Sequence, residues 1–137
     1  MNVSKLILIV DDDNVYKLVT RRMISICCGN AEIIFAENGR EAIDLLQGAI
    51  QDPSLRLPDI ILLDIEMPEM NGWEFLSAFS SLPWMAIRDI KIYVASSSID
   101  ELDRERTQIY PAVKELLVKP FSVSKISGII NDGIRQG

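Results

Sequence analysis

The sequence predicts an α/β protein in which five parallel strands form one sheet with helices on both faces. Three observations predict this class. Five short apolar runs rich in Ile, Leu and Val recur along the chain, segments with helical periodicity separate them, and no repeat or Gly/Ser/Pro-rich linker divides the sequence. Strand–helix alternation repeated in this way implies parallel strands joined by right-handed crossovers. The length fits one domain, which we expect to span residues 1–137.

The five apolar runs are expected to be buried strands. Several of them are continuously apolar rather than alternating, which is typical of parallel strands covered on both faces. The expected strands are Lys5–Val10, Glu32–Ala36, Asp59–Asp64, Lys91–Ala95 and Val113–Val118.

The intervening segments are expected to be amphipathic helices with polar residues at their starts. Asp13 or Asn14 begins the first, Asn38–Gly39 the second, Asn71–Gly72 the third and Ser122 the last, whereas Asp100–Tyr110 is the most charged and the weakest helical pattern. Their inward-facing residues are predicted to be Val15, Leu18, Val19, Met23 and Ile26; Ala42, Leu45, Leu46 and Ala49; Trp73, Leu76 and Phe79; and Val123, Ile126, Ile129, Ile130 and Ile134. Trp84 follows Pro83, and we interpret it as a loop residue packed on the surface, with a partner contact as the alternative.

Composition narrows the classes of function. A net charge of −6 argues against nucleic-acid binding through a broad basic face and suits a divalent cation or a basic partner. The chain has no histidine, which excludes a histidine base, ligand or phosphodonor within it. Its adjacent cysteines, Cys27 and Cys28, are expected to be reduced thiols, because a bridge between neighbours would be strained. The run Leu6–Val10 is too short to span a membrane, so we expect a cytoplasmic protein without a membrane segment.

Polar residues follow four of the expected strands, at the edge of the sheet where ligands of such folds bind. They are Asp11, Asp12 and Asp13 after the first strand, Asp64 at the end of the third, Ser96 after the fourth, and Lys119–Pro120 after the fifth. Each alone has an ordinary structural explanation as a cap, loop or surface residue. Together, crowded carboxylates need a cation among them, and Lys119 and a divalent ion are the available ones. Oxygen ligands without Cys or His favour Mg²⁺, and an aspartate can act as a nucleophile towards phosphorus.

Three segments carry a family resemblance. Ile7-Leu8-Ile9-Val10-Asp11-Asp12, Asp59-Ile60-Ile61-Leu62-Leu63-Asp64-Ile65-Glu66-Met67-Pro68-Glu69-Met70-Asn71-Gly72 and Leu117-Val118-Lys119-Pro120-Phe121 resemble the receiver domains of two-component response regulators. The resemblance covers nearly the whole chain and keeps the order of the motifs. It implies a flavodoxin-like sheet with strand order 2-1-3-4-5.

The resemblance also implies roles for individual residues. Asp64 is the expected phosphoacceptor, and Asp11 and Asp12 are the acidic pair that holds Mg²⁺, with Asp12 the more direct ligand. Glu66 would offer its backbone carbonyl to the metal. Ser96 would turn its hydroxyl towards the phosphoryl group, and Lys119 would contact that group.

Other positions are assigned by the same resemblance. The bond before Pro120 is expected to be cis, and Asp13 is read as a helix-start residue outside the metal pair. Two positions depart from the family pattern. Leu116 replaces a frequent Tyr or Phe, which puts the readout of the signal in doubt, and Ser96-Ser97-Ser98 leaves Ser97 as an alternative to Ser96.

The predicted function is therefore a phosphorylatable receiver that takes a phosphoryl group from a sensor histidine kinase or a histidine phosphotransfer protein. It would catalyse only its own phosphorylation and dephosphorylation. It would signal to a downstream protein through the face made by Asp100–Tyr110, the fifth strand and the last helix. Two alternatives remain: a Mg²⁺-dependent phosphatase with Asp64 as nucleophile, and a binding module that is not phosphorylated.

Overall fold

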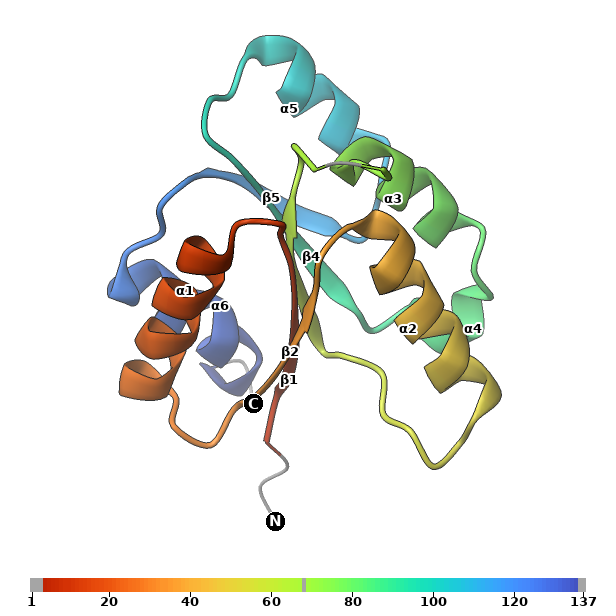
Figure 1. Cartoon of the computed structure of the whole chain (residues 1–137), viewed down its shortest axis with the longest axis horizontal. Helices are drawn as coiled ribbons and strands as arrows, with labels where there is room; N and C mark the ends of the chain where they lie inside the picture. Colours follow the sequence, from red (N-terminus) through yellow and green to blue (C-terminus); the bar gives the residue numbers. More distant parts are fainter. Residues whose placement is uncertain (1–3, 68, 136–137) are drawn as a thin grey trace.

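Five parallel strands form the centre of the structure, in the order β2-β1-β3-β4-β5 (Figure 1). The computed structural model describes residues 4–67 and 69–135. The strands are β1 (Leu6–Val10), β2 (Glu32–Ala36), β3 (Ile60–Asp64), β4 (Lys91–Ser96) and β5 (Val113–Val118). The expected fold class and strand order are confirmed.

Helices cover both faces of this sheet (Figure 1). The helices are α1 (Asn14–Cys27), α2 (Gly39–Gln51), α3 (Gly72–Ser80), α4 (Trp84–Ile87), α5 (Glu101–Gln108) and α6 (Val123–Arg135). Helices α1 and α6 pack on one face, where Ile24 and Ile126 meet Ile7 and Ile9 of β1. Helices α2 and α3 pack on the other, in a core with Phe75 at its centre.

Side-chain caps fix where the helices begin. Asn38 caps α2, and Asn71 and Asp100 form capping boxes at the starts of α3 and α5. The Ser122 hydroxyl accepts from the backbone N–H of Lys125 in the first turn of α6 (3.0 Å). These caps confirm the predicted helix starts, including the start of α5, whose helical pattern in the sequence is the weakest.

The two edge strands differ from the expectation of full burial. In β2, Glu32 and Ile34 are exposed, and in β5 Lys114, Glu115 and Val118 are exposed. An edge strand has a neighbour on one side only, and the helices shield the central strands most completely. Continuous burial therefore holds for β1 and β3, while β2 and β5 are partly open to solvent.

The predicted inward face of α1 is wrong except at Met23, which is partly buried against the core. Val15, Leu18, Val19 and Ile26 are between 44% and 70% exposed. The buried positions of α1 are instead Lys17, Thr20 and Ile24. Lys17 is buried, and its ammonium lies 5.9 Å from the centroid of the Phe35 ring and 3.1 Å from the Glu37 carboxylate. An apolar strip of α1 is consequently left on the surface.

Smaller corrections concern the other helices. Leu45 of α2 is 41% exposed and Val123 of α6 is 38% exposed, although both were expected to face inward. Trp84 is not packed on the surface: it begins the short helix α4, which the sequence pattern did not predict, and is 66% exposed. The side chain of Ile134, and all of Pro68, lie outside the described residues.

None of the helices in the described part of the chain is long and apolar enough to cross a membrane. Cys27 and Cys28 are free thiols, as expected, with their sulfur atoms 2.9 Å apart.

Candidate functional site

The three aspartates that follow β1 occupy different environments. Asp11 is buried, with 1% of its surface exposed, and Asp12 is exposed. Asp13 caps α1, because its carboxylate accepts hydrogen bonds from two backbone N–H groups of the first turn (2.9 and 3.1 Å). The backbone N–H of Asp13 also donates to Oδ1 of Asp11 (2.9 Å). Asp13 is therefore the helix-start residue that the sequence predicted.

Asp64 is the last residue of β3 and is 5% exposed. Its Oδ1 accepts a hydrogen bond from the backbone N–H of Glu66 (3.2 Å). The loop beyond it folds tightly against the strand end, since the N–H of Gly72 donates to the carbonyl of Ile65 (2.8 Å). A Cβ at Gly72 would lie 2.7 Å from Cα of Ile65, so this close approach requires glycine.

Lys119 brings the fifth strand into the site. It follows β5, its backbone N–H donates to the carbonyl of Ser96 (2.9 Å), and its bond to Pro120 is cis, as expected. Its Nζ lies 2.7 Å from Oδ2 of Asp11 and 3.4 Å from Oδ1 of Asp64. One ammonium thus lies against both buried carboxylates.

Sequence reasoning missed Tyr16 as a neighbour of the site. Nζ of Lys119 lies 4.2 Å from the centroid of the Tyr16 ring, which meets Phe121 edge-on at 6.4 Å. Burial raises the pKa of the Tyr16 hydroxyl to about 12, so it stays protonated at neutral pH. The available signal was position: Tyr16 lies in the first turn of α1, directly after the acidic residues.

The serines after β4 are distinguished by their partners. Ser96 is buried at the end of β4, and its hydroxyl donates to the backbone carbonyl of Ser98 (2.6 Å). Ser97 is exposed, and its hydroxyl donates to the carboxylate of Glu66 (3.2 Å). The buried Ser96 therefore occupies the strand-end position, while Ser97 ties the β4 loop to the β3 loop.

Burial and crowding shift the pKa values of the central groups. Burial raises the pKa of Asp64 to about 6, and the neighbouring Asp11 charge adds to the rise while Lys119 opposes it. For Lys119, burial disfavours the ammonium, but the carboxylates of Asp11 and Asp64 outweigh this effect and raise its pKa. The site therefore holds more negative charge than Lys119 alone compensates.

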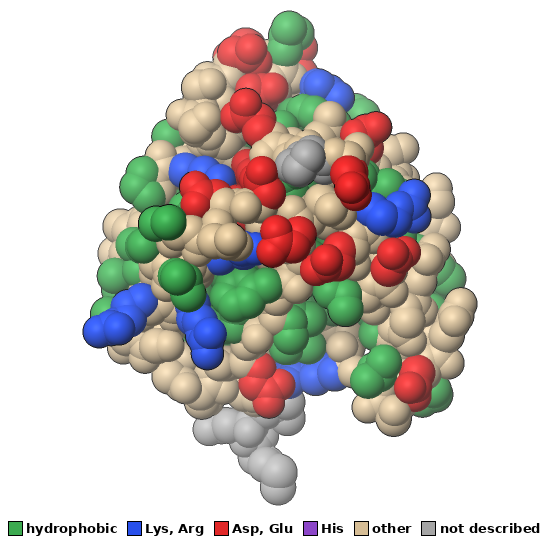
Figure 2. Space-filling model, in the orientation of Figure 1, with side chains coloured by type: hydrophobic (Ala, Val, Ile, Leu, Met, Phe, Trp, Pro, Cys, Tyr) green, Lys and Arg blue, Asp and Glu red, His purple; other side chains and the backbone are tan. Residues whose placement is uncertain are grey.

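This charge imbalance fits a divalent cation. Carboxylate oxygens of Asp11, Asp12 and Asp64 lie within 4.8 Å of one another. Figure 2 shows acidic side chains gathered on the face where the strands end. Hard oxygen donors without Cys or His suit Mg²⁺, which binds proteins through one or two carboxylates and keeps several waters. The oxygen ligands of Asp11, Asp12 and Asp64 therefore fit a Mg²⁺ ion.

Leu116 lies beside Val94 of β4 and packs, partly buried, against the core beneath α2 and α3. A separate contact involves an aromatic ring of α3. The guanidinium of Arg106 on α5 lies 4.0 Å from the centroid of the buried Trp73 ring on α3. This contact joins α5 to α3.

Comparisons with known proteins identify relatives over nearly the whole chain. The chain is 30% identical over 128 residues to the chemotaxis protein CheY of Thermotoga maritima, covering 93% of this chain and 96% of that protein. It is 24% identical over 130 residues to the sensor histidine kinase CheAY of Helicobacter pylori. The chain spans only 15% to 53% of the length of the first three curated relatives it matches.

A solved structure agrees over nearly the whole chain. The crystal structure of a two-component response regulator from Cytophaga hutchinsonii superposes with a TM-score of 0.85 at 25% identity, covering 97% of this chain and 99% of that one. Residues 7–131, which include every residue of the cluster around Asp64, match the family described as the response regulator receiver domain. With the same sheet order and the acidic cluster at the strand ends, this chain belongs to the family of response regulator receiver domains.

Proposed function

We propose that Asp64 accepts a phosphoryl group from a phosphohistidine on a partner protein, and that residues 1–137 act as one receiver domain. The observation that carries this proposal is the position of Lys119. Its Nζ lies against the carboxylates of both Asp11 and Asp64 where β1, β3 and β5 end. A nucleophilic carboxylate beside a fixed cation is the arrangement that transfer to aspartate needs.

The transfer itself is a single displacement at phosphorus. A carboxylate oxygen of Asp64 forms a bond to phosphorus as the bond from phosphorus to the histidine nitrogen breaks. The products are an acyl phosphate on Asp64 and an imidazole that takes up a proton. Because the pKa of Asp64 is about 6, its carboxylate is mostly ionised, and hence nucleophilic, at neutral pH. Lys119 stabilises the negative oxygens of the transferred group.

Asp11, Asp12 and Asp64, with the backbone carbonyl of Glu66, are the proposed ligands of Mg²⁺. When bound, the ion neutralises charge on the phosphoryl oxygens and orients the group. The excess of buried carboxylate over ammonium around Asp64 supports this proposal. The phosphorylation and hydrolysis would be self-catalysed, with no separate substrate.

The phosphodonor is proposed to dock along the exposed strip of α1 formed by Val15, Leu18, Val19 and Ile26. This strip begins directly after the Asp13 cap, so a helix lying on it reaches the edge where Asp64 lies. Apolar side chains that solvent covers in the free protein gain from burial against such a helix. A sensor histidine kinase or a histidine phosphotransfer protein would supply it.

The output is proposed to pass through the face formed by α5, β5 and α6. In the described residues, this face carries exposed apolar side chains suited to a protein partner: Leu102, Ile109, Val118 and Val123. Phosphorylation of Asp64 would draw the Ser96 hydroxyl away from the Ser98 carbonyl and towards the phosphoryl oxygens. The loop between β4 and α5 would move with it.

The partners are proposed to be proteins in the cytoplasm rather than nucleic acid or membrane. The net charge of −6 disfavours contact with a polyanion, and the free thiols of Cys27 and Cys28 suit a reducing compartment.

Treatment with Mg²⁺ and acetyl phosphate tests the proposed function. The intact mass of the wild-type protein should rise by one phosphoryl group, and the modification should be lost in mild base, as an acyl phosphate is. Asp64→Asn should show no gain in mass. A stable modification that persists in the variant would contradict the assignment of Asp64.

The same preparation separates the alternatives. A Mg²⁺-dependent phosphatase would turn over p-nitrophenyl phosphate, but the acid/base aspartate that it needs is replaced by Glu66, whose carboxylate accepts a hydrogen bond from Ser97. A binding module without phosphorylation would show no gain in mass with any donor. The gathering of Asp11, Asp64 and Lys119 disfavours that alternative.

A further inference from the structure

A groove opens at the opposite edge of the sheet from Asp64, where β4 and β5 begin. Its volume is about 530 Å³, within the range of roughly 300–1,000 Å³ typical of ligand pockets. The end of α3, the short helix α4 and the segment between α5 and β5 form its walls. The proposed phosphoryl chemistry uses no residue of this groove.

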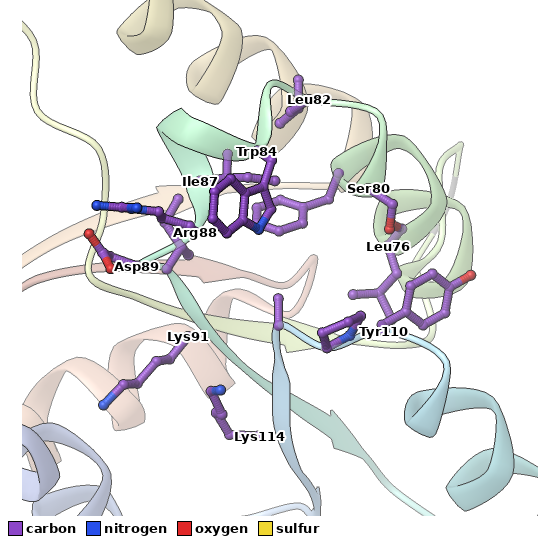
Figure 3. Close-up of a pocket in the computed structure, with 14 residues that line it drawn as sticks. Leu76, Ser80, Leu82, Trp84, Ile87, Arg88, Asp89, Lys91, Tyr110 and Lys114 are labelled. Atoms are coloured by element: carbon purple, nitrogen blue, oxygen red, sulfur yellow. The ribbon is translucent and has the colours of Figure 1, made fainter.

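The walls of the groove are largely apolar. Figure 3 shows the Trp84 ring between Arg88 and Asp89 on one side and Leu76 and Tyr110 on the other. Trp84 is 66% exposed, although Ile87, in the same short helix, is buried in the core. Trp84 is thus held at the surface by a helix anchored through its other side.

Arg88 packs beside that exposed ring. Its guanidinium lies 5.6 Å from the centroid of Trp84, a cation–π contact. An exposed tryptophan held in this way can contact a partner with little loss of rotamer freedom. Tryptophan and arginine are also among the residues that dominate binding energy at protein interfaces.

The charge around the groove is opposite to that of the chain. Exposed Arg88 and Lys114 bring two cationic side chains to it, against one acidic side chain, from Asp89. The whole sequence, in contrast, has 20 acidic and 14 basic residues. An acidic segment is therefore favoured at this groove.

We propose that this groove is a second docking surface, which binds an acidic segment of a partner protein that carries a large apolar side chain. The apolar side chain packs against Trp84 and the half-buried Tyr110, and the flanking carboxylates pair with Arg88 and Lys114. A nucleic acid would need a longer basic track than these few cations provide. The surface lies at the far end of the strands from Asp64, so a protein bound there leaves the phosphorylation site open.

Titration with a synthetic peptide tests the proposal on the full chain. The probe is a capped peptide with adjacent leucine and phenylalanine flanked by glutamates. Its binding is followed by NMR through the indole N–H of Trp84 and the backbone amides of Arg88 and Lys114. We expect saturable shifts with a Kd between roughly 0.1 and 1 mM, as for a small interface. No shift at these residues at about 2 mM peptide would overturn the proposal.

Two control peptides separate the apolar and ionic parts of recognition. Replacing the leucine and phenylalanine by serine should abolish binding, and replacing the glutamates by lysines should weaken it at least about fivefold. If the serine peptide binds as tightly as the original peptide, binding is nonspecific attraction between charges. If the lysine peptide binds as tightly as the original peptide, the partner is not acidic. Either result would overturn the proposal.

Variants of exposed residues avoid disturbing the fold. Trp84→Ala should weaken peptide binding about tenfold or more, and Lys114→Glu about two- to fivefold. Two matched controls should leave binding unchanged: Met85→Ala in the same helix, 71% exposed, and Arg104→Glu, exposed on α5; neither lines the groove. If Trp84→Ala and Lys114→Glu bind the peptide as tightly as the wild-type protein and the two controls, the groove is not the docking surface. Asp64→Asn should bind the peptide normally, so this test is independent of the phosphorylation assay.

Discussion

The carboxylates of Asp11 and Asp64 are both almost fully buried, and the Lys119 ammonium lies against both. Without a divalent ion, ionised Asp64 therefore opposes folding. Asp64→Asn removes that charge while keeping an oxygen that can accept the hydrogen bond from the backbone of Glu66. We predict that the variant is more stable than the wild-type protein in the absence of Mg²⁺.

The size of the gain follows from the pKa of Asp64. The folded protein raises this pKa from 3.8 to about 6. At about 1.4 kcal/mol per pKa unit, the ionised carboxylate destabilises the folded state by about 2 to 3 kcal/mol at pH 7.5. Below the unfolded-state pKa, Asp64 is protonated in both states and the penalty disappears. The gain of the variant should therefore shrink as the pH falls from above 6 towards 4.

Urea unfolding in EDTA, followed by far-UV circular dichroism, measures this difference. Mg²⁺ should stabilise the wild-type protein and stabilise the variant less, because the variant lacks one ligand charge. Asp44→Asn is the matched control. It removes an exposed carboxylate whose contact with Arg40 is 3.9 Å long, and should change stability by less than about 0.5 kcal/mol.

Equal stability of wild type and Asp64→Asn at pH 7.5, or a gain that does not depend on pH, would refute the reasoning. Equal stability would mean that Lys119 and solvent fully compensate the two buried carboxylates, and a gain that does not depend on pH would mean that its source is not the charge of Asp64.

Three further predictions concern the loop, the lysine and the donor surface. Gly72→Ala should lower the free energy of unfolding by about 1 to 3 kcal/mol and slow phosphorylation, because the added Cβ would collide with Ile65. Gly48→Ala in α2 is the control, measured by the same urea unfolding: its added Cβ has no neighbour within 4 Å, so the substitution should be neutral or stabilising. Lys119→Met should raise the pKa of Asp64 further, because the ammonium beside it is lost. The rate of phosphorylation by acetyl phosphate, measured by intact mass, should fall at least about tenfold. An unchanged rate would show that Lys119 has no role in the transfer. Leu18→Glu should slow phosphotransfer from a protein donor that phosphorylates the wild type but not from acetyl phosphate; slowing of both reactions would contradict a docking role for α1.

The fold and the strand-end residues could be predicted because they depend on patterns that extend over many residues. Continuous apolar runs place β1 and β3 in the centre of the sheet, and parallel strands bring their carboxyl ends to one edge. Asp11, Asp64 and Lys119 were therefore expected to meet, and their side chains do. Their chemical roles stay predictions.

The errors arose where one helix face had to be chosen from local periodicity. In α1 the apolar stripe faces solvent, and Lys17 is one of the residues on the buried face instead. Its ammonium forms an ion pair with Glu37. Periodicity cannot recognise a lysine buried in this way. Tyr16 was missed for a related reason, since an aromatic residue in a helix resembles an ordinary core residue.

The short helix α4 could not be expected from so few residues. Its helical pattern covers a single turn, and its exposure depends on how Ile87 anchors it to the core. The groove beside Trp84 is a property of the tertiary structure, because the start of β5 is distant in sequence from α3 and α4.

The central claim is that the phosphoryl group is carried by Asp64, and chemical trapping tests it most directly. Borohydride reduces an acyl phosphate on aspartate to homoserine, which peptide mass spectrometry can locate in the sequence. After reaction with Mg²⁺ and acetyl phosphate, we predict homoserine at position 64 and at no other aspartate. Homoserine at another position, or none in a protein whose mass shows phosphorylation, would contradict the account.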